Sequence, residues 1–456
     1  MEIINGGVSF WHAELGYPQR RAPLAGPVKV DVCIVGAGLT GLWAAYYLKK
    51  AAPSLEIAVL EKTFAGYGAS GRNGGWLTAA MAGSPERYAK RHGVDAVRAL
   101  QQAMIESVDE VMRVAEQEGI EADIVKGGEL QVACTASQLA RLRDSVAESL
   151  RWGGEEELLS APQTVERIAV DGALGGAYTP NCARLQPAKL VRGLAEVVAN
   201  LGVTIYESTP VTEIRPHQAC TPFGVVDATY VLRATEGFTS NMANLHRLWI
   251  PMNSSMIVTE PLSPDAWDQI GWRGYETLGD SAHMYIYAQR TADDRIAIGG
   301  RGKPYRFGSH VDRDGITSPE TIAELRAILG RLFPSVANVR IDHAWSGVLG
   351  VPRDWCSTVG LDASTGLGWA GGYVGHGVTT TNLAGRTLRD LVLASDTALT
   401  QLPWVDWKAR NWEPEPLRWI GVHSLYAAYR AADRVEFGGR TTTSPIATVA
   451  NVISGR

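Results

Sequence analysis

The sequence predicts a fold of the α/β class, and two patterns in the chain of 456 residues carry this prediction. The first is a strand, a helix and a second strand in succession between residues 28 and 61, which together form a βαβ unit. The second is the recurrence of helical apolar stripes and short apolar strands through the rest of the chain. At roughly 150 residues per domain, this length corresponds to about three domains or to two large domains whose segments interleave.

The βαβ unit opens with Val28–Val35, a β-branched run that ends in glycines, as expected of a buried parallel strand. Leu39–Lys50 has the length and composition of a helix. Ile57–Leu60 follows as a second buried strand and closes on Glu61. The order strand, helix, strand predicts two neighbouring parallel strands joined by a crossover helix.

Two later helices are expected from apolar residues at spacings of three and four. One stripe runs from Leu139 to Leu150 behind Thr135, a candidate cap. The other runs from Leu190 to Leu201 and stops at Gly202, which suits the position after a helix end. Further strands are expected at residues 203–207, 225–226, 230–232, 284–287 and 295–298, the last two as a pair around the turn 291–294.

Charge and composition exclude several classes of protein. Lys and Arg number 43 against 48 Asp and Glu, and no segment is dense in one sign, which argues against a nucleic-acid-binding surface. Met1–Gly16 lacks a basic stretch followed by an apolar run, so we expect a cytoplasmic, soluble protein without a membrane partner. The five cysteines form no CxxC pair and indicate neither a disulfide framework nor a metal site.

A glycine motif lies between the first strand and the first helix. Gly36, Gly38 and Gly41 form a GxGxxG pattern, and Glu61 stands twenty residues beyond Gly41 at the end of the second strand. In a dinucleotide-binding βαβ unit the first glycine allows a tight turn, the second lets the backbone approach a pyrophosphate, and the third lets helix and strand pack closely. The acidic residue accepts a hydrogen bond from a ribose hydroxyl. The pattern therefore predicts a bound dinucleotide.

Two more glycine loops are candidates for contact with the same cofactor. Gly66–Gly75 contains five glycines, and its Ser70 and Arg72 add donors suited to a phosphate or to the edge of a heteroaromatic ring. Gly371–Gly377 leads into an expected helix at Val378–Leu393. Either loop alone could be an ordinary turn. Together they are typical of the two sides of one extended cofactor.

An ordered set of motifs in this chain resembles the FAD-dependent D-amino-acid oxidase family, and within it the gamma-glutamylputrescine-oxidase-like amine oxidase branch. The likeness covers most of residues 28–395. The motifs are residues 31–41, Glu61, residues 68–75, Ala234-Thr235, residues 259–262, 298–300 and 345–347, and residues 372–378.

The resemblance implies an α/β plus α+β fold, in which a glutathione-reductase-type FAD-binding Rossmann domain is interleaved with a substrate domain built on an antiparallel sheet. The FAD-binding domain is expected at residues 28–92, 160–245 and 340–398. The substrate domain is expected at residues 93–159 and 246–339. A Trp-rich tail, residues 399–456, lies outside the shared motifs, and its tryptophans are expected to serve packing.

The cofactor implied by the resemblance is FAD, held without a covalent bond. Leu349 stands near the position where some relatives attach the flavin to a cysteine, and Cys356 is interpreted as an ordinary buried thiol. The expected cofactor-binding residues are Gly36, Gly38, Leu39, Thr40, Gly41, Glu61, Lys62, Gly68, Ala69, Ser70, Arg72, Asn73, Gly74, Gly75, Val211, Ala234, Thr235, Gly347, Gly372, Gly375, Gly377, Val378 and Thr379.

The candidate catalytic residues are His376, Tyr287 and Gln289. His376 lies between two glycines at an expected helix start, so it could face the flavin or the substrate. Tyr287 and Gln289 belong to the expected strand where relatives carry a lysine over the flavin, and Thr379 replaces a second such lysine. His283 and His343 have no patterned partners and are interpreted as structural.

The resemblance implies oxidation of the C–N bond of an amine or amino acid, with hydride transfer to flavin N5 and hydrogen peroxide formed from O₂. The expected partners are a small-molecule amine and O₂. A dehydrogenase of the same fold that passes electrons to a quinone or an electron-transfer protein is one alternative. A non-catalytic flavoprotein that binds a partner through its tail is another.

Overall fold

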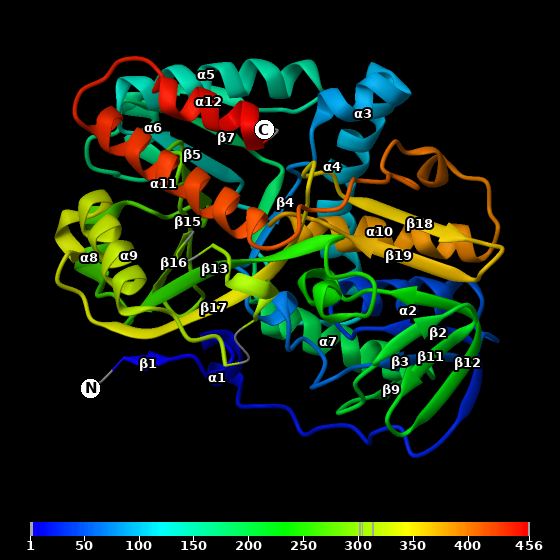
Figure 1. Ribbon diagram of the computed structural model, residues 1–456. Coiled ribbons are helices and arrows are strands. Elements are labelled where there is room, and N and C mark those ends of the chain that lie inside the picture. The colour runs from blue at the N-terminus through cyan, green and yellow to red at the C-terminus, as the bar shows by residue number, and fades with distance from the viewer. Residues whose placement is uncertain (1–2, 301, 303, 312–313, 455–456) are drawn as a thin grey trace.

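The computed structural model describes residues 3–300, 302, 304–311 and 314–454. Two large sheets dominate it, one of eight strands and one of nine (Figure 1). Helices α2 (Leu39–Ala51), α7 (Pro187–Asn200) and α10 (Gly377–Val392) pack beside the eight-stranded sheet and share its largest apolar core.

The eight-stranded sheet contains the βαβ unit that the sequence predicts. Strand β2 (Val28–Val35) pairs in parallel with β3 (Ile57–Leu60) on one side and with β12 (Gly224–Arg233) on the other. The order is β10-β11-β12-β2-β3-β9, and β19 joins β12 while β18 joins β19. The other strands are β9 (Thr204–Tyr206), β10 (Glu213–Arg215), β11 (Gln218–Thr221), β18 (Thr358–Asp362) and β19 (Leu367–Gly371).

The nine-stranded sheet has the order β1-β17-β13-β16-β15-β14-β5-β7-β6 and is mostly antiparallel. Its strands are β1 (Ile4–Asn5), β5 (Glu129–Ala133), β6 (Glu157–Ser160), β7 (Gly175–Thr179), β13 (Trp249–Thr259), β14 (Thr277–Asp280), β15 (Tyr287–Arg290), β16 (Ile296–Gly300) and β17 (Ile341–Pro352). A two-stranded sheet pairs β4 (Trp76–Thr78) with β8 (Cys182–Arg184).

The remaining helices surround these sheets. They are α1 (Phe10–Leu15), α3 (Pro85–His92), α4 (Val94–Gln117), α5 (Ala136–Arg151), α6 (Ala161–Arg167), α8 (Pro264–Ile270), α9 (Pro319–Leu332), α11 (Leu417–Phe437) and α12 (Pro445–Ser454). Short 3₁₀ turns include Ala69–Gly71 and Glu236–Asn241. Within the described residues, no helix is both long and apolar enough to cross a membrane.

The helix signals of the sequence act as expected. The Thr135 side chain caps α5 by accepting from the Gln138 N–H, and Gly202, at φ 88°, follows the end of α7. The expected strand at 284–287 was placed three residues too early, because β15 begins at Tyr287. The residues before it contain Met284, whose N–H donates to Asp433 of α11, so long-range contacts hold them outside the ladder.

The two sheets divide the chain differently from the expected domain boundaries. Strands β7 and β17 belong to the nine-stranded sheet, although residues 160–245 and 340–398 were assigned to the other domain. Helix α4, expected in the substrate domain, packs against α10 in the core of the eight-stranded sheet. Sequence patterns do not reveal which sheet a strand joins. We propose that the domain division follows the sheets.

The tail returns to the body of the molecule (Figure 1). Trp404 is fully buried in the core beside α10, and the buried Trp412 donates from its indole to the Val351 carbonyl at 2.7 Å. Trp407 packs edge-on against Tyr88, whereas Trp419 stays partly exposed. Three of the four tail tryptophans therefore serve packing, as expected.

Candidate functional site

One cavity of about 1830 Å³ runs between the two sheets and collects most of the residues that the sequence singles out. The predicted residues that line it are Gly36, Gly38, Leu39, Thr40, Glu61, Lys62, Gly68, Ala69, Ser70, Arg72, Asn73, Gly74, Val211, Ala234, Thr235, Tyr287, Gly347, Gly375, His376, Gly377 and Val378. We call the part bordered by residues 36–41, Glu61 and loop 66–75 the glycine end.

At the glycine end, each of the three motif glycines is needed for a different geometric reason. Gly36 adopts φ 110°, and a Cβ there would lie 2.6 Å from the Ala234 carbonyl oxygen. A Cβ on Gly41 would lie 2.0 Å from the Gly36 oxygen, so Gly41 allows helix and strand to pack closely without lining the cavity itself. Gly38 is the N-cap of α2 and supplies no side-chain acceptor. The first N–H groups of α2 are thus placed as in anion-binding helix starts.

Ser70 and Glu61 complete this end. The Leu39 N–H donates to Ser70 Oγ at 2.8 Å, which joins the helix start to loop 66–75. Glu61 accepts from the Ala37 N–H at 3.0 Å and from the Thr63 N–H at 2.8 Å. Burial raises the pKa of its carboxyl, and these hydrogen bonds oppose the shift. The carboxyl is fixed at the end of β3, where a ribose hydroxyl would meet it.

Loop 66–75 is supported by the N-terminal segment, which sequence reasoning missed. The Trp11 indole donates to the Asn73 carbonyl at 2.8 Å, and the Ser9 hydroxyl donates to the Gly71 carbonyl at 2.7 Å. His12 lies against the Gly66 carbonyl, and burial lowers the pKa of its imidazole to about 4. No spacing rule connects residues 9–12 with a loop sixty positions away, so only the fold could reveal this support.

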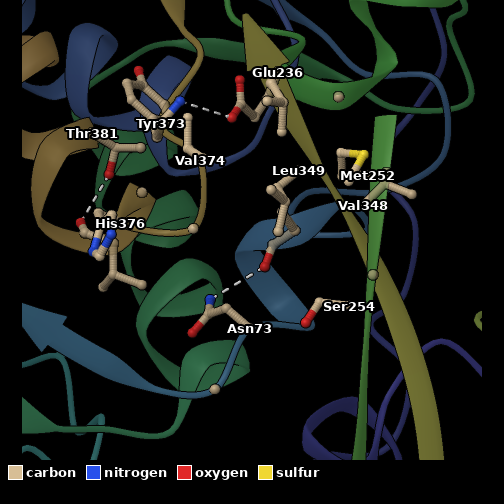
Figure 2. Close-up of a pocket in the computed structure, with 18 of the residues that line it drawn as sticks. Asn73, Glu236, Met252, Ser254, Val348, Leu349, Tyr373, Val374, His376 and Thr381 are labelled. Carbon is tan, nitrogen blue, oxygen red and sulfur yellow. Dashed lines mark hydrogen bonds between the residues drawn. The ribbon is translucent and has the colours of Figure 1, made fainter. Parts of the chain in front are cut away.

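Arg72 was expected to donate to the cofactor, but much of its guanidinium is used within the protein. Its Nε donates to the Tyr67 carbonyl at 2.8 Å and its Nη1 to the Ser346 carbonyl at 3.2 Å. The side chain is 5 % exposed and ties loop 66–75 to β17. Arg72 therefore also holds the cavity wall together. Asn73, at the edge of the space in Figure 2, donates to the Ser70 carbonyl at 3.0 Å.

Glu236 is a second residue that sequence reasoning missed. Its carboxylate accepts from the N–H groups of Gly350 at 3.2 Å, Gly372 at 2.9 Å and Tyr373 at 3.2 Å, the last drawn in Figure 2. Burial raises its pKa to about 7, against the effect of these bonds and of Arg233. Glu236 thus clamps the last glycine loop to β17. The only sequence signal is its place directly after the Ala234-Thr235 motif.

This clamp also explains two corrections. Gly372 does not line the cavity, because its N–H is held by Glu236 and a Cβ there would lie 2.5 Å from Pro352. Thr379 is buried inside the first turns of α10 and lies outside the lining, and its Oγ1 has no hydrogen-bond partner among the described residues. Both support the loop without facing the cavity.

Gln289 was expected to be catalytic, and the structure places it elsewhere. Its side chain is 1 % exposed, and its Nε2 donates to the carbonyls of Gly74 at 2.7 Å and Leu185 at 3.1 Å. A Cβ on Gly75 would lie 2.0 Å from that Nε2, so Gly75 also serves packing and does not line the cavity. Gln289 therefore holds the end of loop 66–75 by these hydrogen bonds and does not line the cavity.

Tyr287 does line the cavity. Its hydroxyl lies 2.8 Å from the hydroxyl of Ser254, and its ring fills the space beside Gly74, where a Cβ would lie 2.7 Å away. Figure 2 places Ser254, Met252 and Leu349 on one side of the space and His376 on the other. A planar ring system between them would contact loop 66–75 and β13 together.

His376 is the N-cap of α10 and lines the cavity with its glycine neighbours. Its side chain makes no cap hydrogen bond, while its carbonyl accepts from the Thr380 hydroxyl at 2.6 Å. Gly375, at φ 108°, has nothing within 4 Å of an ideal Cβ, so the loop is open at this point. The N-terminal N–H groups of α10 therefore border the cavity.

Leu349 lies at the cavity wall, whereas Cys356 lies outside the lining. Cys356 is fully buried, and burial raises the pKa of its thiol to about 12. A thiol in this environment is a poor nucleophile, because the thiolate is the reactive form. The geometry agrees with the interpretation of Cys356 as an ordinary buried residue.

Beyond Tyr287 the cavity continues into a second region, which we call the distal lobe. Its lining comes from β4, β5, α5, the connection to β6 and the loop between β14 and β15. These residues are Trp76, Thr78, Glu129, Gln131, Arg141, Glu148, Trp152, Glu155, Glu156, Asn181, Asp280, Ser281 and Tyr285. Five of them carry carboxylates: Glu129, Glu148, Glu155, Glu156 and Asp280.

Glu129 is the central carboxylate of the distal lobe. Tyr287 pairs with Gly279 on β14 and Gly279 pairs with Gln131 on β5, so Tyr287, Gln131 and Glu129 lie on one face of the sheet. Glu129 accepts from Gln131 Nε2 at 2.8 Å and from the Thr78 hydroxyl at 2.9 Å. Burial raises the pKa of its carboxyl, since none of these contacts is a cation.

The basic side chain of the distal lobe is already paired. Among the described residues that line this lobe, Arg141 is the only Lys or Arg. Its Nη2 donates to Glu436 of α11 at 3.0 Å and to the Ser281 carbonyl at 2.7 Å. The lobe therefore offers acceptors and negative charge to a ligand, and little to bind a ligand carboxylate.

One further observation indicates that the cavity suits a large cofactor. Asn253 of β13 borders the space, and its buried Nδ2 has no hydrogen-bond partner among the described residues. An unsatisfied buried donor costs about 1–3 kcal/mol, and a ligand acceptor would remove that cost. The cavity therefore fits FAD. It offers the buried donor of Asn253, the open helix start at Gly38, the fixed carboxyl of Glu61 and the length that an extended cofactor needs.

Comparison with known proteins agrees with this geometry. The model of the family described as FAD dependent oxidoreductase (DAO) matches residues 31–391. Gamma-glutamylputrescine oxidoreductase of Escherichia coli (strain K12) is 31% identical over 372 residues, which cover 80% of this chain and 84% of the relative. A probable oxidoreductase, OrdL, of Haemophilus influenzae is 29% identical and covers 83% of this chain and 86% of its own.

Solved structures share the fold. Glycine oxidase from Geobacillus kaustophilus aligns with a TM-score of 0.66 at 23% identity, covering 83% of this chain and 98% of its own. L-proline dehydrogenase from P. horikoshii aligns with a TM-score of 0.67 at 18% identity, also covering 83% and 98%. The family and the cofactor indicated by the sequence motifs are confirmed. This chain belongs to the DAO family of FAD-dependent oxidoreductases, with FAD as its cofactor.

Proposed function

We propose that this protein oxidises the C–N bond of an amine or amino acid, giving an imine that water hydrolyses to a carbonyl compound, and hydrogen peroxide from O₂. Bound FAD supplies the hydride acceptor at flavin N5 and the route of the electrons to O₂. The chain supplies binding, orientation and electrostatics around the reacting carbon.

The cofactor roles follow the order of residues along the cavity. The α2 start, with Gly36, Gly38 and Ser70, is the proposed pyrophosphate site, and Glu61 with Lys62 and Val211 lies at the proposed adenosine side. Tyr287, Leu349 and loop 66–75 are proposed to enclose the flavin ring. The start of α10 carries a partial positive charge of roughly half a unit, which favours negative charge on a neighbouring ring edge.

The observation that carries the choice of an amine is the distal lobe. Glu129 is a cavity carboxylate held by two neutral donors, and Glu155 and Glu156 line the same lobe. A buried carboxylate is stabilised by a cation, and an alkylammonium group is such a cation. A free amino-acid carboxylate would meet like charge there. We therefore favour an amine over a simple amino acid as substrate.

The two alternatives make different use of the chain. A dehydrogenase would use the same cavity and differ only in the electron acceptor, and the fold neighbours include proteins named oxidase and dehydrogenase. A tail-mediated assembly protein is less favoured, because Trp412 and Glu413 of the tail contact Arg247 and Arg353 of the same chain. These tail groups have partners already.

A panel of amines, amino acids and hydroxy acids tests the proposal. The purified holoenzyme is mixed with each compound under air and under argon, and flavin absorbance and hydrogen peroxide are followed. Reduction by amines under argon with peroxide formed under air is expected. Reduction without peroxide favours the dehydrogenase. Reduction only by hydroxy acids, or by nothing in the panel, contradicts the proposal.

We also expect FAD to be released when the protein is precipitated with acid. The reason is that Leu349 stands near the position where the resemblance places the attachment cysteine of some relatives, and Cys356 does not line the cavity. The measurement is flavin absorbance in the supernatant and the pellet. A yellow pellet that keeps its flavin after washing contradicts noncovalent binding, and the variant Cys356→Ala then tests whether that thiol is the attachment point.

A further inference from the structure

Helix α11 begins at Leu417, beyond the family-matched residues 31–391, yet it reaches the cavity. Its Tyr426 is 7 % exposed and lines the same space as the flavin-side residues. It shares one apolar cluster with Met252 and with Leu349 and Val374, which border the space in Figure 2. A helix of the tail thus supplies part of the cavity wall.

We infer that α11 is part of the active site and that Tyr426 is a specificity-determining residue, which contacts the apolar carbon chain of the amine. This inference rests on the proposed function. The apolar cluster that contains Tyr426 also contains Met252, Leu349 and Val351, and these side chains offer apolar surface with no charge. The charged nitrogen belongs with the carboxylates of the distal lobe, so the apolar wall is left for the alkyl or aryl part.

The position of α11 is fixed by two carboxylates one turn apart. Asp433 accepts from the N–H groups of His283 and Met284, both at 2.9 Å. Glu436 accepts from His283 Nε2 at 2.8 Å and from Arg141 Nη2 at 3.0 Å. His283 and Met284 belong to the loop between β14 and β15, which lines the distal lobe. The helix therefore holds a wall of the cavity as well as forming one.

Glu436 is ionised in this anchor. Burial opposes its charge, but the hydrogen bonds from Arg141, the Ser444 N–H and His283 outweigh burial and lower its pKa to about 2. His283, Asp433 and Glu436 lie close enough together for a cation, yet Arg141 already balances the charge and their oxygens already accept from N–H donors. The cluster is an anchor for α11, which makes Asp433 and Glu436 positioning residues.

The test compares Tyr426→Ala with Ile420→Ala. Ile420 lies on the same helix, but its side chain is exposed and it does not line the cavity. The first readout is quenching of flavin fluorescence by acrylamide in the FAD-loaded protein, which needs no turnover. We expect at least a twofold larger quenching constant for Tyr426→Ala and an unchanged value for Ile420→Ala.

The second readout is the ratio of kcat/KM for a branched or aryl amine to that for a linear amine. A change of at least about tenfold is expected for Tyr426→Ala and less than about twofold for Ile420→Ala. Tyr426→Leu keeps the apolar packing and replaces the alanine variant if that variant does not fold. Wild-type quenching and wild-type ratios in a folded Tyr426 variant overturn the inference.

The two readouts separate this inference from the proposed function. One outcome is that no amine is oxidised but the quenching constant rises for Tyr426→Ala and not for the control variant. In that case α11 borders the flavin, and the proposed substrate is wrong. If amines are oxidised and neither readout changes, α11 is a structural cover only. Glu436→Gln should raise quenching as Tyr426→Ala does, because it weakens the contact that holds α11, and an unchanged value contradicts the anchoring role.

Discussion

The glycine end and the distal lobe of the cavity are built in different ways. The glycine end takes most of its geometry from residues 36–75, and it offers a ligand backbone N–H groups at turns and a helix start. The distal lobe draws its walls from β4, β5, α5 and the loop after β14, between Trp76 and Tyr285. Its polar contacts are side chains, chiefly carboxylates. One end is therefore set by local spacing and the other by long-range packing.

The two ends also differ in what holds them. Backbone groups at the glycine end cannot be removed by a side-chain change, so only added volume disturbs them. The distal lobe depends on individual side chains and on the pair between Arg141 and Glu436. Substitutions at the glycine end should therefore abolish cofactor binding, whereas those elsewhere in the cavity should alter rate, selectivity or stability.

The largest effect is expected for Gly38→Val. A Cβ on Gly38 would lie 2.9 Å from Ser70 Oγ, where the chain opens the proposed pyrophosphate site, and two further methyl groups would extend into it. We expect a folded protein that purifies without flavin absorbance. Circular dichroism checks the fold, and absorbance of the released flavin measures the loss.

Gly26→Val is the matched control for this change. No atom lies within 4 Å of an ideal Cβ on Gly26, and it does not line the cavity. It should retain FAD at the wild-type ratio. Retention of FAD by Gly38→Val would mean that the glycine end is wider than its backbone indicates.

An intermediate effect is expected for His376→Ala, at the start of α10 in the cavity wall. FAD should stay bound, because the glycine end is untouched, but anaerobic flavin reduction by substrate should slow about 10- to 1000-fold. This corresponds to the loss of one preorganised contact worth about 1.4–4 kcal/mol. Stopped-flow absorbance measures the rate. His217→Ala, at an exposed position in the turn between β10 and β11, is the control and should leave the rate unchanged.

Reduction of the His376→Ala variant at the wild-type rate would assign His376 a structural role. The N–H groups at the start of α10 would then be the only part of that helix left to act on the flavin. In that case the glycine end and the rest of the cavity would differ less, because less of the rest would depend on individual side chains.

The smallest effect is expected for Glu236→Gln, which changes stability with pH. Burial raises the pKa of Glu236 from 4.5 to about 7 in the folded protein. In this range the folded state holds the proton more tightly than the unfolded state, so the contribution of Glu236 is fully present below pH 4.5 and is lost as the pH rises through 7. The stability of the wild-type protein should fall over this pH range because of Glu236, and the stability of Glu236→Gln should not show this fall.

The measurement is the unfolding temperature of both proteins between pH 5 and pH 8 with FAD in fixed excess. The variant is expected to unfold a few degrees below the wild type near pH 5, because an amide NH₂ faces the N–H groups of Gly372 and Tyr373. The difference should narrow toward pH 8. A difference that widens with pH would contradict the assigned pKa shift.

The parallel βαβ unit of the eight-stranded sheet, the N-cap of α5 and the end of α7 could be predicted from sequence, because they depend on neighbours in the chain. Most of the proposed cofactor residues line one cavity, and Gly41, Gly75, Gly372 and Thr379 do not. The errors occur where the partner is distant: β15 starts late because α11 holds Met284, and Gln289 faces the Gly74 carbonyl and not the cavity.

By itself, the sequence determined the family, the cofactor and the glycine end, since GxGxxG spacing with Glu61 fixes a turn, a helix start and an acceptor within one βαβ unit. Only the tertiary structure decided that Trp11 supports the loop at Asn73, that Glu236 clamps the last glycine loop, and that Tyr426 of the tail reaches the cavity. These contacts join segments up to hundreds of residues apart. Their partners are chosen by burial and packing in three dimensions, which leave no periodic pattern in the chain.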